Sequence, residues 1–133
     1  MLVVDASLVV AALIDSGKDG AWALERLGAG PLAAPHLMPV EAANILRRAA
    51  LSGQVSADSA SLAHADLLAL PIQFFPYAPF AERVWELRGN LTSYDAWYVA
   101  LAETLGAKLA TLDVRLSRAQ GARCVFEVPA QAS

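Results

Sequence analysis

The sequence contains a single cysteine, Cys124, among its 133 residues. One cysteine cannot close a disulfide within the chain, and no other ligand lies at zinc spacing from it, so disulfide scaffolds and zinc-thiolate modules are excluded. Long apolar segments are also missing, because the run from Leu8 to Ile14 is too short to span a bilayer and follows no basic segment. We therefore expect a cytoplasmic protein with neither a membrane span nor a signal peptide.

Charged residues are scarce, at 17% of the chain, whereas hydrophobic residues make up 56%. This balance is the opposite of the low-hydrophobicity, high-charge composition of disordered chains, so the sequence is expected to fold. A length of 133 residues suits one domain that buries roughly two-thirds of the surface of its unfolded chain. We expect a single domain over residues 1–133, with a short C-terminal tail from about residue 129.

Basic residues are outnumbered, with 10 against 13 acidic residues and a net charge of −3. An acidic balance argues against nucleic acid as a partner. The argument weakens if several of the acids surround a divalent cation, because the ion reverses the sign of the local charge. Most of the basic residues are arginines, which suit forked phosphate contacts better than lysines. Net charge therefore leaves a nucleic-acid partner open.

Short β-rich runs alternate with longer helical runs along the whole chain. Pro39 suits the first position of a helix, Ser56 and Ser93 are expected N-caps of two others, and Gly106 is expected to end the second of these in the left-handed conformation. We expect strands at 2–5, 32–34, 72–77, 108–112 and 123–128, and helices at about 6–14, 21–27, 39–53, 57–70, 79–88, 94–105 and 113–119. This alternation predicts an α/β fold in which a five-stranded parallel sheet lies between helical layers.

Four acidic residues fall at equivalent places on this predicted scaffold. Asp5 closes the first strand and Asp113 follows the fourth, while Glu41 and Asp95 each lie in the first turn of a helix. In open α/β sheets, ligands bind outside the carboxyl ends of the strands. The sequence therefore predicts that four carboxylates from four separate segments converge at this edge of the sheet.

Carboxylates that lie close together raise one another's pKa values and destabilise a fold unless a cation lies between them. Oxygen ligands without cysteine or histidine at ligand spacing favour Mg²⁺, with Mn²⁺ as a possible substitute, over zinc. Such an ion activates water and stabilises charge on a phosphoryl oxygen, which suits phosphodiester hydrolysis. The alternative, that each acid only caps a helix or complements its dipole, stays open on these observations alone.

The four acids lie within four ordered motifs: V-V-D-A-S at 3–7, P-V-E-A-A-N-I-L-R-R at 39–48, T-S-Y-D-A-W-Y-V-A-L-A-E at 92–103 and A-T-L-D-V-R-L at 110–116. In order and spacing, and over nearly the whole chain, these motifs resemble the PIN-domain ribonucleases of the VapC toxin type. The resemblance implies that the acids bind the metal and carry the catalysis; they are Asp5, Glu41, Asp95 and Asp113.

The resemblance also implies accessory residues beside the four acids. Ser7 and Thr111 stand where hydrogen-bonding side chains often assist the site of this family, and Asn44 stands where an accessory polar residue is common.

A fold, a substrate class and partners follow from the same resemblance. The family fold is a parallel sheet between helical layers, in agreement with the element count. VapC toxins are Mg²⁺-dependent endoribonucleases that cut structured RNA, tRNA or rRNA, to inhibit translation and growth, and a VapB antitoxin silences them. They usually form homodimers, which often pair again around the antitoxin into heterotetramers or larger assemblies. We expect a VapB-like antitoxin to dock on leucine-rich helix faces, for example at Leu62, Leu67 and Leu68.

Four arginines follow two of the acids closely and are candidates for RNA contact. Arg47 and Arg48 lie one to two turns beyond Glu41, and Arg115 and Arg118 lie just past Asp113. Contact with backbone phosphates is the functional interpretation. Salt bridging or plain solvation is the alternative.

Other chemistry-bearing residues fit no motif. His36 and His64 are isolated and are expected to be surface or core histidines rather than bases or ligands. Cys124 lies in a predicted apolar strand and is expected to fill the core. Trp97 and Tyr98 lie in a helix that is apolar on most faces, so we expect them in the core or at a dimer interface.

Three other functions are alternatives to a nuclease. A phospho-accepting receiver domain needs an early acidic pair and a late lysine, and a haloacid-type phosphatase needs an acid two residues after Asp5, where this chain has Ser7. Both are weak. A non-catalytic module that binds RNA or protein on the same fold remains the stronger rival, although intact acids argue against it.

Overall fold

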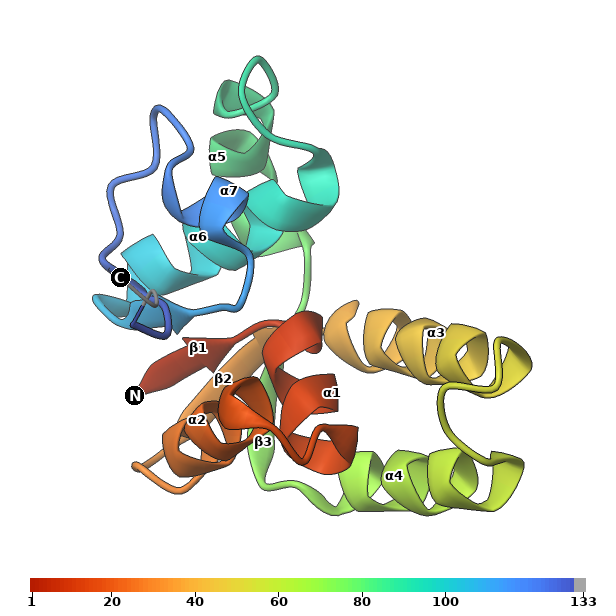
Figure 1. Ribbon diagram of the computed structural model, residues 1–133. Helices are drawn as coiled ribbons and strands as arrows, with labels where there is room; N and C mark the ends of the chain where they lie inside the picture. Colours follow the sequence, from red (N-terminus) through yellow and green to blue (C-terminus); the bar gives the residue numbers. More distant parts are fainter. Residues whose placement is uncertain (131–133) are drawn as a thin grey trace.

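The protein, described here by a computed structural model over residues 1–130, is built around five short strands (Figure 1). Every neighbouring pair of strands is parallel, and the order across the sheet is β3-β2-β1-β4-β5. The strands are β1 (Leu2–Val4), β2 (Leu32–Pro35), β3 (Ile72–Phe75), β4 (Lys108–Ala110) and β5 (Phe126–Glu127). The predicted α/β fold with a five-stranded parallel sheet is confirmed.

Helices connect the strands and cover both faces of the sheet. Figure 1 shows α1 to α4 gathered on one side of the strands, and α5, α6 and α7 on the other. They are α1 (Ala6–Ile14), α2 (Lys18–Leu27), α3 (Met38–Leu51), α4 (Ala57–Ala69), the 3₁₀ turn Ala78–Phe80, α5 (Ala81–Glu86), α6 (Ser93–Leu105) and α7 (Val114–Ser117). Within residues 1–130, none of these helices has the length and apolar character needed to cross a bilayer.

The core lies on both sides of β1. Residues Val3, Val4, Ala33 and Leu109 of the central strands are fully buried, as expected for a parallel sheet that is covered on both faces. Helix α6 is buried along the whole run 96–102 and packs against β1, β2 and β4. It is therefore the most deeply buried helix of its layer.

The strand order changes direction at β1. The chain moves outward from β1 to β2 and β3, and then returns across the sheet to place β4 on the other side of β1. The carboxyl ends of β1 and β4 therefore lie side by side at a switch point, where open α/β sheets form their ligand-binding crevice.

Helix ends agree with the sequence pattern where a cap is distinctive. Ser56 caps α4 and accepts from the Ser59 amide, and Gly106 ends α6 with φ 61°, as predicted. Ser93 is not an N-cap: Thr92 caps α6, because either adjacent hydroxyl has the chemistry for this role and only the backbone decides between them. Helix α3 begins one residue before Pro39, which becomes its second residue.

Several elements are shorter than predicted. Strand β3 ends at Phe75, because Pro76 has no amide to donate, and the predicted helix 79–88 is a 3₁₀ turn followed by α5, which ends at Glu86. The strand predicted at 108–112 ends at Ala110, and the strand predicted at 123–128 covers only Phe126–Glu127, because the pairing of β4 with β5 stops there. The helix predicted at 113–119 covers only Val114–Ser117. Cys124 consequently lies just before β5, partly buried. Of the predicted tail, residues 131–133 lie outside the described residues.

Helix α2 begins at Lys18, three residues earlier than predicted, and Gly20 lies in its first turn. Glycine usually weakens a helix, but here it permits close contact with the end of α1. A Cβ added at Gly20 would lie 1.7 Å from the carbonyl oxygen of Asp15 and 2.9 Å from that of Ala11. The close approach of α1 and α2 therefore requires glycine at this position.

We expect Gly20→Ala to lower the free energy of unfolding by about 1–3 kcal/mol, because the α1 backbone must move away from the new methyl group. Urea denaturation measures this change. Gly89→Ala is the matched control, since a Cβ at Gly89 meets no atom within 4 Å and its effect should stay within about 0.5 kcal/mol. Equal stability of the two variants would contradict the tight contact.

Candidate active site

The four predicted acids line a single cavity of about 250 Å³ at the carboxyl edge of the sheet. Ser7 and Asn44 also line it, together with Arg48 and Tyr98; the acids are Asp5, Glu41, Asp95 and Asp113. We call this the acid cavity. The predicted convergence of four carboxylates from four segments is therefore what the fold produces.

Asp5 is the buried carboxylate of the acid cavity, with 7% of its surface exposed. It follows β1 as the N-cap of α1, where its Oδ1 accepts from the Leu8 amide at 3.0 Å and from the Ser7 hydroxyl at 2.8 Å. Its Oδ2 accepts from the hydroxyl of Thr111. Burial raises the pKa of Asp5 and the charge of Asp113 adds to this, although the three donors oppose it.

Thr111 joins the ends of β1 and β4. It is completely buried, it donates to Asp5, and its Oγ1 accepts from the Asp113 amide at 2.9 Å. Asp113 is exposed and caps α7, with Oδ1 accepting from the Arg115 and Leu116 amides at 2.9 and 3.2 Å. The predicted accessory position of Thr111 is therefore a direct link between two of the acids.

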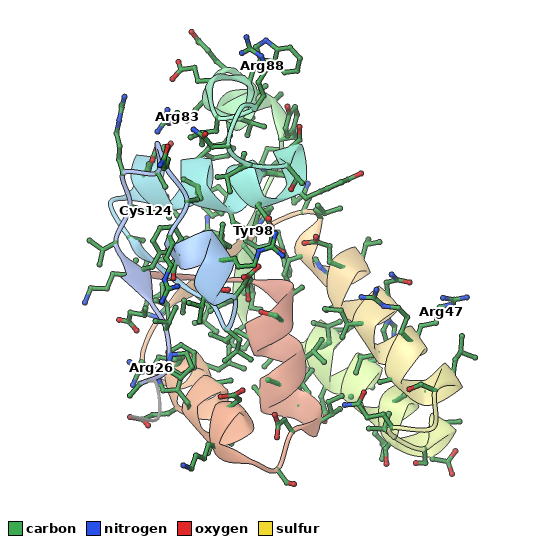
Figure 2. All side chains as sticks on the ribbon, turned by 45° about the horizontal axis from the view of Figure 1, so that its top comes forward. Arg26, Arg47, Arg83, Arg88, Tyr98 and Cys124 are labelled. Carbon is green, nitrogen blue, oxygen red and sulfur yellow. The ribbon has the colours of Figure 1, made fainter. Side chains whose placement is uncertain are left out.

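Glu41 lies in the first turn of α3 and is half-buried. Its Oε1 accepts from the Tyr98 hydroxyl at 2.6 Å. Burial raises the pKa of Glu41, and the charges of Asp95 and Asp5 raise it further, whereas the bond from Tyr98 lowers it. Figure 2 shows Tyr98 in the interior of the protein, between α6 and the start of α3.

Asp95 lies in the first turn of α6, after the cap residue Thr92, whose Oγ1 accepts from the Asp95 amide at 3.2 Å. Burial raises the pKa of Asp95 and the charge of Asp113 raises it further. Hydrogen bonding with Thr92 and the charge of Arg115 act in the opposite direction. Three of the four acids are therefore harder to ionise than an isolated carboxyl group.

Capping of helices and convergence on one cavity are both observed for the acids. Asp5 and Asp113 cap α1 and α7, so the capping interpretation is correct for both, yet they share one cavity with Glu41 and Asp95. The donor set is oxygen only, which suits a hard divalent cation. Among the described residues, however, no three histidine, cysteine, aspartate or glutamate side chains are already arranged to hold a metal ion.

The four candidate arginines differ in their relation to the acid cavity. Arg48 lines it, and the charge of Arg115 acts on Asp95. Arg47 and Arg118 are exposed and do not line the cavity, and Figure 2 shows Arg47 pointing away from the body of the protein. The sequence predicts which helices carry the arginines but does not fix where their long side chains point.

The other chemistry-bearing residues lie outside the acid cavity, with one exception. His36 and His64 are exposed and do not line it. Trp97 is 9% exposed and packs edge-on against Tyr77, so it belongs to the core. Tyr98 is the exception, because its ring is buried while its hydroxyl reaches Glu41. An amphipathic aromatic residue three positions after Asp95, on the same face of α6, is the signal that could have identified it.

Residues 2–122 match the model of the family described as PIN domain. The fold and the acid cavity lie almost entirely within these residues, so the class of the protein is that of a PIN domain.

The chain is also similar to individual proteins of known name or structure. Ribonuclease VapC9 of Mycobacterium tuberculosis is 41% identical over 128 residues, which cover 96% of this chain and 98% of that protein. The crystal structure of M. tuberculosis VapC20, a sarcin-ricin loop cleaving toxin, is similar with a TM-score of 0.68 and 18% identity, over 88% of this chain and 93% of that one. A toxin-antitoxin complex from Klebsiella pneumoniae gives a TM-score of 0.64 and 18% identity, over 99% and 100%. The two structures show a shared fold, and the chain belongs to the PIN-domain family, with VapC proteins as its relatives.

We expect the charge of Glu41 to destabilise the metal-free protein increasingly as the pH rises above 4.5, the ordinary pKa of a glutamate. Because folding raises this pKa, the folded state keeps a proton that the unfolded state has lost, and stability falls as the pH rises through the window between the two values. Glu41→Gln removes this effect and still accepts a bond from Tyr98. Its free energy of unfolding relative to wild type should therefore rise as the pH increases toward neutrality.

Thermal or urea unfolding in EDTA at several pH values measures this difference. Asp66→Asn is the matched control, because Asp66 is an exposed acid on α4 that does not line the acid cavity. It should show no comparable gain as the pH rises. A relative stability of Glu41→Gln that does not change with pH would contradict the electrostatic strain in the cavity.

Proposed function

We propose that this protein is a divalent-metal-dependent endoribonuclease that acts as the toxin of a VapBC-type toxin–antitoxin system. The observation that carries the proposal is the convergence of four carboxylates, from four different elements, on one cavity at the switch point of the sheet. Membership of the PIN-domain family and the similarity to ribonuclease VapC9 support it. Cleavage of RNA is the reaction that this donor set and these relatives favour together.

The metal ligands in this proposal are Asp5, Glu41, Asp95 and Asp113, and the ion is Mg²⁺, for which Mn²⁺ can substitute. The all-oxygen donor set and the raised pKa values of three of these acids fit a hard divalent cation. Since no three of the described acids are already arranged around one point, some of these side chains must move for the ion to bind. When bound, the ion supplies activation of water and stabilisation of negative charge on the phosphate.

The chain's own residues hold and orient the reacting groups. Ser7 and Thr111 fix the buried carboxylate of Asp5 on opposite oxygens, so that it cannot rotate. Arg48, in the wall of the cavity, and Arg115, whose charge acts on Asp95, provide positive charge for the RNA backbone. Asn44 adds a polar side chain to the wall. The exposed Arg47 and Arg118 serve at most an outer part of the RNA.

Structured RNA, either tRNA or rRNA, is the proposed substrate class. The similarity of the fold to VapC20, a toxin that cleaves the sarcin-ricin loop, is consistent with such a target. Hydrolysis of this kind would leave 5′-phosphate and 3′-hydroxyl ends.

A VapB-like antitoxin is the proposed protein partner, and a homodimer is the proposed form of the toxin, joined into a heterotetramer or larger assembly with the antitoxin. A groove of about 440 Å³ between α1 and α3 shares Ser7, Ile45 and Arg48 with the acid cavity, so a bound segment there would reach the acids. Leu62 and Leu68 are exposed on α4, as a docking face requires, whereas Leu67 is buried in the core. The expectation for Leu67 is therefore wrong, because it lies on the inner face of α4.

A cleavage assay on total RNA tests the proposed reaction. The purified wild-type chain should cut at a few sites in Mg²⁺ and at none in EDTA. Asp95→Asn should lower the cleavage rate by about 100-fold or more, because loss of a residue that only hydrogen-bonds to a metal ligand already lowers activity by about 10–100-fold. Mapping of the RNA ends identifies the target and the bond. Asp66→Asn should cleave like wild type.

Stable RNA binding in Mg²⁺ without new RNA ends would support the rival function, a non-catalytic binding module. The assay is repeated on denatured and refolded protein, which removes a retained antitoxin. Cleavage that survives in Asp95→Asn would refute the proposed site.

The phosphate contact of Arg48 has its own test. Arg48→Ala should weaken RNA binding to a similar extent for different sequences and reduce the slope of log K against log salt by about 1. Arg88→Ala is the control, because Arg88 lies over the Trp85 ring on the distant helix α5. An unchanged salt slope in Arg48→Ala would remove Arg48 from the RNA-binding surface.

A further inference from the structure

Tyr98 combines a core ring with a polar contact in the acid cavity. Its side chain is 2% exposed, and it lies in the buried run 96–102 of α6. Its hydroxyl donates to Oε1 of Glu41 at 2.6 Å, between residues that are 57 positions apart in the chain. Helix α6 and helix α3 are thus joined through this bond at the edge of the cavity.

The hydroxyl of Tyr98 is not needed for packing. The other residues of the run 96–102 pack in the core through apolar atoms, and a phenylalanine ring would fill the same space as the ring of Tyr98. A buried hydroxyl without a partner costs free energy, so its presence here is explained by the carboxylate that accepts it. A short bond from a neutral hydroxyl to a carboxylate is also among the stronger hydrogen bonds in proteins.

The other anchored acids show what such a bond does. Asp5 is fixed by donors on both oxygens and Asp113 by two backbone amides on one oxygen, so each carboxylate has a defined orientation. Glu41 has a longer and more flexible side chain, and the bond from Tyr98 occupies Oε1. Because this bond engages Oε1, it leaves Oε2 available for a ligand and reduces the number of orientations that the carboxylate can adopt.

We propose that Tyr98 is a positioning residue that holds the Glu41 carboxylate in the orientation needed to bind the divalent cation. This inference rests on the proposed function of the acid cavity. Tyr98 acts only through Glu41 and does not itself contact the ion or the RNA. It is thus the partner behind a metal ligand, a class of residue whose loss weakens metal binding without removing a ligand.

Binding of Mn²⁺ alone, followed by the loss of the electron paramagnetic resonance signal of the free ion, tests this role without any catalytic readout. Tyr98→Phe should bind Mn²⁺ about 10-fold more weakly than wild type while it folds normally. Tyr94→Phe is the matched control, because it removes a hydroxyl from the same helix at a residue that is 61% exposed. Its affinity for Mn²⁺ should equal that of wild type.

A double-mutant cycle separates positioning from a general structural effect. In a Glu41→Ala background, Tyr98→Phe should cause no further loss of Mn²⁺ affinity, because the only residue through which it acts is gone. A loss of equal size in both backgrounds would overturn the proposal, as would an affinity of Tyr98→Phe within about two-fold of wild type. If Tyr98→Phe does not fold, Glu41→Asp replaces it: the shorter side chain cannot reach Tyr98, so near-wild-type Mn²⁺ affinity would overturn the proposal.

Failure of this inference and failure of the proposed function give different results. A wild-type chain that binds Mn²⁺ but cuts no RNA would refute the nuclease while the effect of Tyr98→Phe on Mn²⁺ still supports the positioning role. A wild-type chain that binds no Mn²⁺ would overturn both. Normal binding and cleavage by Tyr98→Phe would refute the positioning role alone.

Discussion

The site depends on one arrangement: a carboxylate buried at the end of the central strand and held by donors from two elements. Burial of a charged group is costly unless hydrogen bonds replace the water that it loses. Asp5 accepts from Ser7 and the Leu8 amide on its own helix, and from Thr111 at the end of β4. Thr111 in turn accepts from the Asp113 amide. The register of β1 against β4 therefore also fixes the distance between the first and the last acid of the cavity.

The other two acids reach the cavity from helix starts, and this difference sets their chemistry. Glu41 and Asp95 lie in first turns, where the helix dipole favours negative charge, but burial and neighbouring charges oppose it more strongly and raise both pKa values. The fold therefore keeps like charges together at a cost in stability. Proteins commonly accept such a cost at functional sites, where the strained groups are those that contact a ligand.

The sequence predicted most of the fold and the acids of the site, because both depend on local patterns. Strands and helices follow from periodicity, and Asp5 and Asp113 follow from their places after strands. It did not predict the contact of Tyr98 with Glu41, since a buried aromatic in an apolar helix is indistinguishable from a core residue until the position of α3 is known. The sequence also did not predict that Arg48 lines the cavity whereas Arg47 points away from it. Which of two adjacent residues reaches the cavity depends on the rotation of the helix about its axis and on the side-chain conformation. The predicted strands are too long wherever a strand ends because its pairing with a neighbour ends and not because its composition changes.

The position of β1 has a consequence for the time at which the acid cavity can exist. Of the five described strands β1 is synthesised first, yet it lies in the middle of the sheet, and its neighbour β4 is synthesised only after β2 and β3. The bond between Asp5 and Thr111 spans 106 positions, so it can form only after synthesis has passed the end of β4. A nascent chain that ends before β4 therefore has one side of β1 open and lacks Asp113. Any activity of the acid cavity therefore requires that synthesis has passed Asp113, the last of the four acids along the chain.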